Sequence, residues 1–104
     1  MVLYVGKWNI RPEKAGDYGE WAKSVIGRMF SVPGIVEFRG YRPATGPYEV
    51  VVTFEFADMN AWATWESNDD MRQLRQEMSL FCDNINYELW GPSPVVPEPV
   101  RPGK

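Results

Sequence analysis

Apolar residues alternate with other residue types along four segments of the chain, a pattern that indicates β-strands because successive strand side chains point to opposite faces. The first segment covers residues 2–10 and ends before Arg11-Pro12, where proline supplies no amide for a sheet ladder. Residues 35–42 and 48–56 flank the turn-forming stretch 43–47, which predicts an antiparallel hairpin. A last, shorter strand is expected from Ile85 to Trp90.

Between these strands the apolar residues recur every three or four positions, the spacing of one helix face. The first helix is predicted to begin at Pro12, because proline is favoured at the first helical position. Asp58 suits the N-cap of the second helix, and the capping-box form of Ser67-Asn68-Asp69-Asp70 indicates a break or restart there. The two stripes consist of Tyr18, Trp21, Ala22, Val25, Ile26, Met29 and Phe30, and of Met71, Leu74, Met78 and Phe81.

The resulting order β-α-β-β-α-β predicts an α+β, ferredoxin-like fold with a four-stranded antiparallel sheet and two helices on one face. Residues 1–91 form this domain, and residues 92–104 are a proline-rich tail that we expect to be extended or disordered. Leu3, Val5 and Val51 are apolar residues directed to the sheet face that the helices leave uncovered. Because a large exposed apolar face normally marks an interaction surface, we predict a homodimer whose sheets pack face to face.

The amino-acid composition says more about which catalytic and metal sites are excluded than about the fold. The chain has 104 residues, of which 44% are apolar and 24% charged, the balance of a soluble globular protein. It contains no histidine, so catalytic, zinc, iron or haem sites that need an imidazole cannot be built. The single Cys82 favours a cytoplasmic location and a buried, inert thiol. A net charge of −3 argues against nucleic-acid partners, and no apolar run predicts a membrane span.

Several segments together resemble a known family. Arg11-Pro12-Glu13-Lys14 after a strand, Val32-Pro33-Gly34-Ile35 before a hairpin, and Phe54-Glu55-Phe56-Ala57-Asp58 before an aromatic-bearing helix are similar in layout to the antibiotic biosynthesis monooxygenase-like family of dimeric α+β barrels. The resemblance covers residues 2–90 and implies a dimeric α+β barrel. It also implies a cofactor-free monooxygenase of polycyclic phenols or quinols, a haem-degrading enzyme, or a member with no assigned reaction.

Two positions depart from the haem-degrading branch of that family. Trp65 stands where many members carry a helix histidine, and Gly6 stands where haem degraders have an asparagine on the first strand. We therefore expect no haem and no other cofactor. The resemblance places a pocket between sheet and helices, where it would bind a flat phenol-type or quinol-type molecule on an aromatic wall made of Tyr4, Trp8, Phe54, Phe56, Trp62 and Trp65.

The sequence leaves the activity open. Aromatic residues at these spacings also fill ordinary cores, so a non-catalytic dimeric binding or structural module is the alternative to a monooxygenase. No catalytic residue is assigned, and Glu37 and Glu55 are candidate proton acceptors. Arg39 and Arg42 are candidates for holding an anionic group, and pairing with Glu49 or Glu55 across strands explains them equally well. A faint likeness to the strand motifs of RNA-recognition domains fails at Tyr48-Glu49-Val50-Val51, where basic and glycine residues are required.

Overall fold

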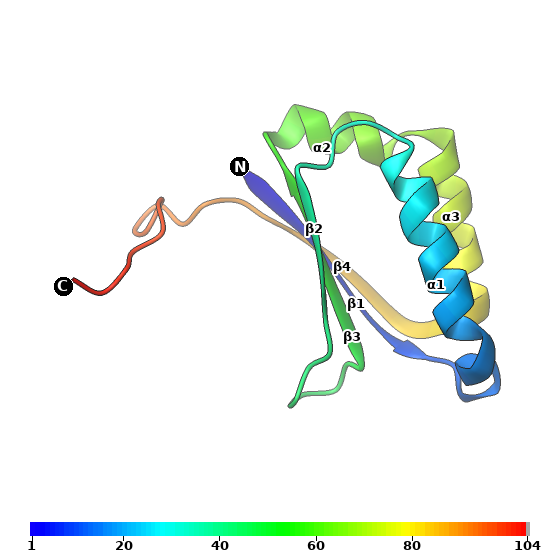
Figure 1. The fold of residues 1–104 in the computed structure, drawn as a ribbon. Helices are drawn as coiled ribbons and strands as arrows, with labels where there is room; N and C mark the ends of the chain where they lie inside the picture. The colour runs from blue at the N-terminus through cyan, green and yellow to red at the C-terminus, as the bar shows by residue number, and fades with distance from the viewer. Residues whose placement is uncertain (104) are drawn as a thin grey trace.

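The computed structural model describes residues 1–103. Within them, one antiparallel sheet has the strand order β2-β3-β1-β4, and the helices lie together on one of its faces (Figure 1). The strands are β1 (Val2–Ile10), β2 (Glu37–Tyr41), β3 (Val50–Phe56) and β4 (Cys82–Trp90). The helices are α1 (Ala15–Phe30), α2 (Met59–Glu66) and α3 (Asp69–Phe81), with α1 packed beside α3. The predicted ferredoxin-like arrangement is confirmed, with the second helix divided in two.

The division between α2 and α3 follows from local capping. The Asp58 carboxylate accepts a hydrogen bond from the Ala61 amide at 2.8 Å and caps α2, as predicted. The cap of α3, however, is Asn68 and not Ser67 as expected. The Asn68 side chain accepts from the Asp70 amide at 2.8 Å, whereas Ser67 keeps helical angles and ends α2. An N-cap needs an extended backbone, which Asn68 has and Ser67 lacks.

Several boundaries differ from the prediction. Strands β2 and β3 each begin two residues later than expected, at Glu37 and Val50, and β2 ends one residue earlier, at Tyr41. Pro12 begins a short 3-10 turn, Pro12–Lys14, and the α-helix starts only at Ala15. Strand β4 begins at Cys82 rather than at Ile85, directly after α3. A β-bulge explains why alternation did not reveal these first residues: Lys7 is opposite Asn86 but Asn9 is opposite Asp83, so β4 holds one extra residue, and Asn84 has a positive φ of 53°.

The core fills the space between the sheet and the helices. Phe56 and Cys82 are fully buried, and α3 contributes three apolar residues of its predicted stripe. Phe81, the fourth, stacks on Trp21 of α1 with ring centroids 4.5 Å apart. Beyond the core, Arg28 and Glu77 tie α1 to α3 through two hydrogen bonds of 2.9 and 2.6 Å. The main buried residues are Val2, Tyr4, Trp8, Val25, Met29, Val52, Phe54, Phe56, Trp65, Met71, Leu74, Met78 and Cys82.

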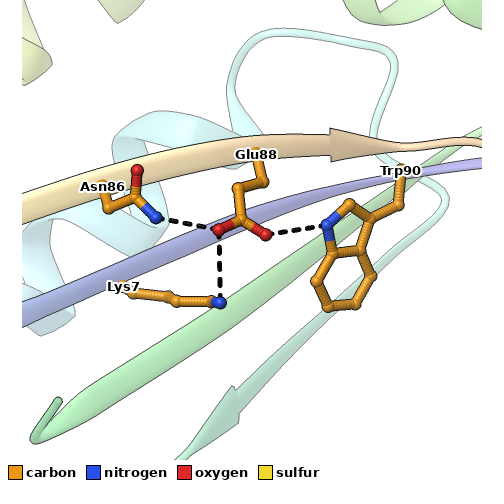
Figure 2. A network of polar contacts seen from close by, with 4 residues as sticks. All are labelled: Lys7, Asn86, Glu88 and Trp90. Carbon is orange, nitrogen blue, oxygen red and sulfur yellow. Dashed lines mark hydrogen bonds and ion pairs between the residues drawn. The ribbon is translucent and has the colours of Figure 1, made fainter. Parts of the chain in front are cut away.

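The sheet face away from the helices is mixed rather than uniformly apolar. Leu3, Val5 and Val51 lie on it as alternation predicts, since none belongs to the helix-side core. Only Leu3 and Val51 are partly exposed, however, because Val5 is 1% exposed and adds no apolar surface. Beside them, however, stands a polar network centred on Glu88 of β4. Its carboxylate accepts hydrogen bonds from Lys7 at 3.3 Å and from Asn86 and Trp90 at 2.9 Å (Figure 2). These bonds, that from Trp90 above all, lower the pKa of Glu88.

The last described residues, 92–103, form neither helix nor strand and are exposed throughout. Figure 1 shows them leading away from the sheet. Residue 104, the end of the predicted tail, lies outside the described residues. Among residues 1–103, none of the helices is long and apolar enough to cross a membrane.

Gly6 leaves room for two aromatic rings, from β1 and β4, to pack directly over its backbone. A Cβ atom there would lie 2.8 Å from Cζ3 of Trp8, 3.0 Å from Cε1 of Tyr87 and 3.2 Å from Cγ2 of Val52. These rings are large and rigid, so they cannot yield without moving their own neighbours. The absence of a side chain at this position is therefore a packing requirement.

We predict that Gly6→Ala lowers the free energy of unfolding by about 1–3 kcal/mol, because it overpacks this contact. Urea unfolding followed by tryptophan fluorescence measures the change. Gly40→Ala on β2 is the control, since nothing lies within 4 Å of its Cβ. Equal stability of the two variants would contradict the packing requirement.

Candidate functional site

A cavity of about 180 Å³ lies between the sheet and the helices. All four strands and α1, α2 and α3 contribute to its wall. The wall is mainly aromatic and aliphatic, which suits an apolar ligand with a few polar groups. The aromatic lining residues are Tyr4, Trp8, Tyr18, Trp21, Phe38, Phe54, Trp65 and Tyr87.

The structure brings four of the six predicted pocket residues to the cavity. Tyr4, Trp8, Phe54 and Trp65 line it, because β1 and β3 pair directly and α2 places Trp65 over both. The other two lie behind this wall and do not line the cavity. Phe56 is fully buried against Trp65, with ring centroids 5.3 Å apart, and Trp62 packs on Tyr4 at 5.7 Å.

Three tyrosines bring hydroxyl groups to the cavity wall. The Tyr18 hydroxyl accepts a hydrogen bond from Nε1 of Trp8 at 2.9 Å, which fixes the Trp8 ring. Tyr4 and Tyr87 stack on one another with centroids 5.3 Å apart and planes 9° apart. Burial raises the pKa of all three, so each hydroxyl stays protonated and able to donate a hydrogen bond at neutral pH.

One ion pair is part of the largely apolar cavity wall. Glu66 ends α2 and Arg75 lies on α3, and their Oε1 and Nη1 atoms are 2.6 Å apart. Arg75 also donates through Nη2 to the Glu66 carbonyl oxygen at 3.2 Å, so the guanidinium holds both parts of the residue. The second carboxylate oxygen, Oε2, is buried and has no hydrogen-bond partner among the described residues. Both residues line the cavity.

Burial raises the pKa of the Glu66 carboxyl group, while Arg75 and Tyr4 act in the opposite direction. The carboxylate in turn adds to the rise in the pKa of Tyr4 and Tyr87, after burial. Its field therefore reaches the ring pair at the cavity wall. The Tyr4 hydroxyl lies close enough to the Glu66 carboxylate to lower its pKa, although Oε2 accepts no hydrogen bond of good geometry from the described residues.

Sequence reasoning missed Glu66 and Arg75. They are separated by the break between α2 and α3, so helical spacing does not connect them. The carboxylates considered from sequence lie elsewhere: Glu37 and Glu55 are paired with each other across β2 and β3 and do not line the cavity. The expected cross-strand pairing of Arg39 is also wrong, because its guanidinium bonds Glu37 of the same strand at 2.7 Å.

Gly6 and Trp65, the two positions at which the sequence departs from the haem-degrading pattern, both lie in tightly packed surroundings. At Gly6 the rings of Trp8 and Tyr87 take the space that a side chain would need. Trp65 is 4% exposed and packs on Phe54 and Phe56. In residues 1–103, no group of three or more His, Cys, Asp or Glu side chains could hold a metal ion. Cys82 is fully buried, and burial raises its pKa to about 12.

These features define a ferredoxin-like α+β protein with an aromatic cavity between sheet and helices. The sequence profile of the family described as antibiotic biosynthesis monooxygenase matches residues 1–77. The chain belongs to this family. No curated protein matches it in sequence.

Solved structures show the same fold at low sequence identity. A DABB-family protein with a ferredoxin-like fold from Mesorhizobium loti is 12% identical, with a TM-score of 0.78 over 88% of this chain and 96% of its own. A candidate antibiotic biosynthesis monooxygenase from Deinococcus radiodurans is 11% identical, with a TM-score of 0.77 over 100% of both chains. HapK from Hahella chejuensis is 17% identical, with a TM-score of 0.73 over 99% and 100%.

The raised pKa of Glu66 predicts a specific dependence of stability on pH. The folded state binds the Glu66 proton more tightly than the unfolded state, so stability falls as pH rises from the ordinary value of 4.5 through the raised pKa. For one group this slope is at most about 1.4 kcal/mol per pH unit. Glu66→Gln should remove this fall with pH, whatever stability it loses overall because Arg75 has no partner.

Urea unfolding at a series of pH values measures this difference. Glu20→Gln, on the exposed side of α1, makes the same change of charge away from the cavity and should preserve the wild-type profile. Parallel profiles for the wild type and Glu66→Gln would contradict the assignment.

Proposed function

We propose that this protein is a cofactor-independent monooxygenase that binds a flat phenol-type or quinol-type molecule in the cavity between sheet and helices. The observation that supports this function best is the cavity itself. It offers about 180 Å³ lined mainly by aromatic rings, with a single carboxylate–guanidinium pair among its lining residues. Aromatic walls orient a flat ligand, and a few polar groups fix its direction.

Oxidation of a phenol by O₂ without a cofactor requires few protein groups beyond such a cavity. A phenol that loses its hydroxyl proton becomes an electron-rich anion, which can pass an electron to O₂. One oxygen atom then enters the ring at an open position, and the other leaves as water, so that the phenol becomes a quinone. All electrons come from the substrate. The protein has to orient the ring, exclude water and accept the proton.

The proposed activity predicts that the protein accelerates O₂ uptake by some members of a panel of hydroquinones and anthrone-like phenols. Ala22→Phe should abolish the acceleration, because Ala22 lines the cavity and a phenyl ring there would fill it. Ala63→Phe, at an exposed position of α2, is the matched control and should keep it. An oxygen electrode measures the rate.

Two outcomes would contradict the activity. Uptake no faster than the uncatalysed rate across the whole panel would remove the monooxygenase proposal. If phenols then still quench tryptophan fluorescence in the wild type but not in Ala22→Phe, the alternative function, a non-catalytic binding module, takes its place.

We also propose that the protein acts as a cytoplasmic homodimer with the uncovered sheet faces packed together. Three observations support this arrangement. Leu3 and Val51 are partly exposed on this face, where Val5 is already buried within the single chain. Tyr41 and Trp90 are about half exposed, and the buried free thiol of Cys82 suits a reducing compartment. The charged Lys7–Glu88 network beside the apolar residues gives the interface a defined register.

Light scattering coupled to size-exclusion chromatography tests the dimer. At micromolar concentration the wild type should show about twice the chain mass of 12.0 kDa. Val51→Lys should shift it to the monomer mass with the fold retained, because it places a charge on the apolar part of the face. Val95→Lys, in the exposed tail, should leave the dimer intact. A monomeric wild type would overturn the proposal.

A further inference from the structure

Among the residues that line the cavity, Glu66 supplies the one carboxylate and Arg75 the one guanidinium. The remaining polar groups of the lining side chains are tyrosine hydroxyls and tryptophan N–H groups. The N–H groups of Trp8 and Trp21 are donated to Tyr18 and Glu77, while that of Trp65 is buried without a partner among the described residues and is a donor only. A neutral ligand with a hydroxyl group would therefore meet one strong acceptor in the cavity. That acceptor is the Glu66 carboxylate.

The two oxygens of this carboxylate are unlike one another. Oε1 is 2.6 Å from Nη1 of Arg75, and Oε2 is buried without a hydrogen-bond partner among residues 1–103. A buried unpaired acceptor is costly, and it becomes satisfied when a donor enters beside it. Because Arg75 holds both the carboxylate and the main-chain oxygen of Glu66, the carboxylate is fixed in place before any ligand arrives.

The cavity volume limits the size of such a donor. Its volume of about 180 Å³ is close to that of an engineered cavity of about 150 Å³ that binds benzene. A single aromatic ring with short substituents, or two fused rings, is therefore the class that enters without rearrangement.

We propose that Glu66 is the proton acceptor for a one-ring or two-ring phenol, with Arg75 as its positioning residue. This role rests on the proposed function. The O–H bond of the phenol breaks, a new O–H bond forms at Oε2, and the electron pair stays on the phenol oxygen. When oxygen enters the ring, the C–H bond at that carbon breaks. Its proton and the proton held by Glu66 leave with the second oxygen atom as water, which returns the carboxylate to its starting form.

The electrostatics of the site support this role. Burial raises the pKa of Glu66, which strengthens it as a base toward a phenol. The charged and titratable groups that act on it are Arg75 from α3 and Tyr4 from β1, and Tyr87 from β4 lies within its field. The pKa of both tyrosines is raised, so they remain neutral donors and do not compete for the proton.

A bound chromogenic phenol can report this proton without turnover. We would bind 4-nitrophenol to the full chain under nitrogen and follow its phenolate absorbance against pH. In the wild type the carboxylate and the phenol share one proton, so the bound phenol should ionise at least about one pH unit above the free compound. In Glu66→Gln, Arg75 is unopposed and favours the phenolate, so the apparent pKa should fall by at least about one unit from the wild type.

Two further variants complete the design. Glu20→Gln, remote from the cavity, should titrate like the wild type. Arg75→Gln removes the cation and should raise the apparent pKa further. This shift would not follow from a merely structural contact, and it keeps the test open if Glu66→Gln fails to fold. Superimposable titrations of the wild type and both cavity variants, or no binding of 4-nitrophenol to the wild type, would overturn the proposal.

Oxygen uptake separates this role from the proposed function. With a one-ring or two-ring phenol that the wild type oxidises, Glu66→Gln should lower kcat by ~100-fold and change KM by less than about threefold, since the amide still accepts a hydrogen bond but takes no proton. Equal kcat values in the two proteins would overturn the role of Glu66 and leave the monooxygenase standing. A Glu66-dependent titration without any oxidation would remove the monooxygenase and keep the proton contact.

Discussion

The structure depends on a layer of rigid aromatic rings packed between one face of a small sheet and its helices. Trp8 and Tyr87 meet at Gly6, where the backbone alone leaves enough room, and Tyr4 stacks on Tyr87. Aromatic rings tilt and stack in preferred geometries and do not deform to fill every gap. The same aromatic rings form much of the core and line the cavity beside it. The stability of the domain and the shape of its cavity therefore have the same physical origin.

A charge at the edge of this layer needs a reason to be there. Glu66 and Arg75 form a partly buried ion pair across the break between α2 and α3, and such a pair is often no more stabilising than apolar residues of similar volume. The unpaired Oε2 adds to the cost. Structural sites that stay costly in this way are often functional ones. A carboxylate held at this cost suits the proton transfer proposed for Glu66.

The two faces of the sheet differ in the residues that they present. On the helix side, apolar residues enclose a ligand-sized space, while the other side combines Leu3, Val5 and Val51 with the Glu88 network. A charged network beside an apolar patch suits a surface that is covered by a partner in a fixed orientation. Lys7 and Val5 are consecutive on that face of β1, so the same strand that supplies Tyr4 and Trp8 to the cavity also serves the opposite surface.

The periodicity of apolar residues determined the strands, the helices, the ferredoxin-like order and which residues of β1 and β3 face the helices. These features follow from spacing along the chain, because strand and helix repeats fix which side chains share a face. Only the tertiary structure decided that Tyr4, Trp8, Phe54 and Trp65 line a cavity while Phe56 and Trp62 lie behind it. It alone paired Glu66 with Arg75, because the turn between two helices, and not sequence spacing, sets the distance between their charges.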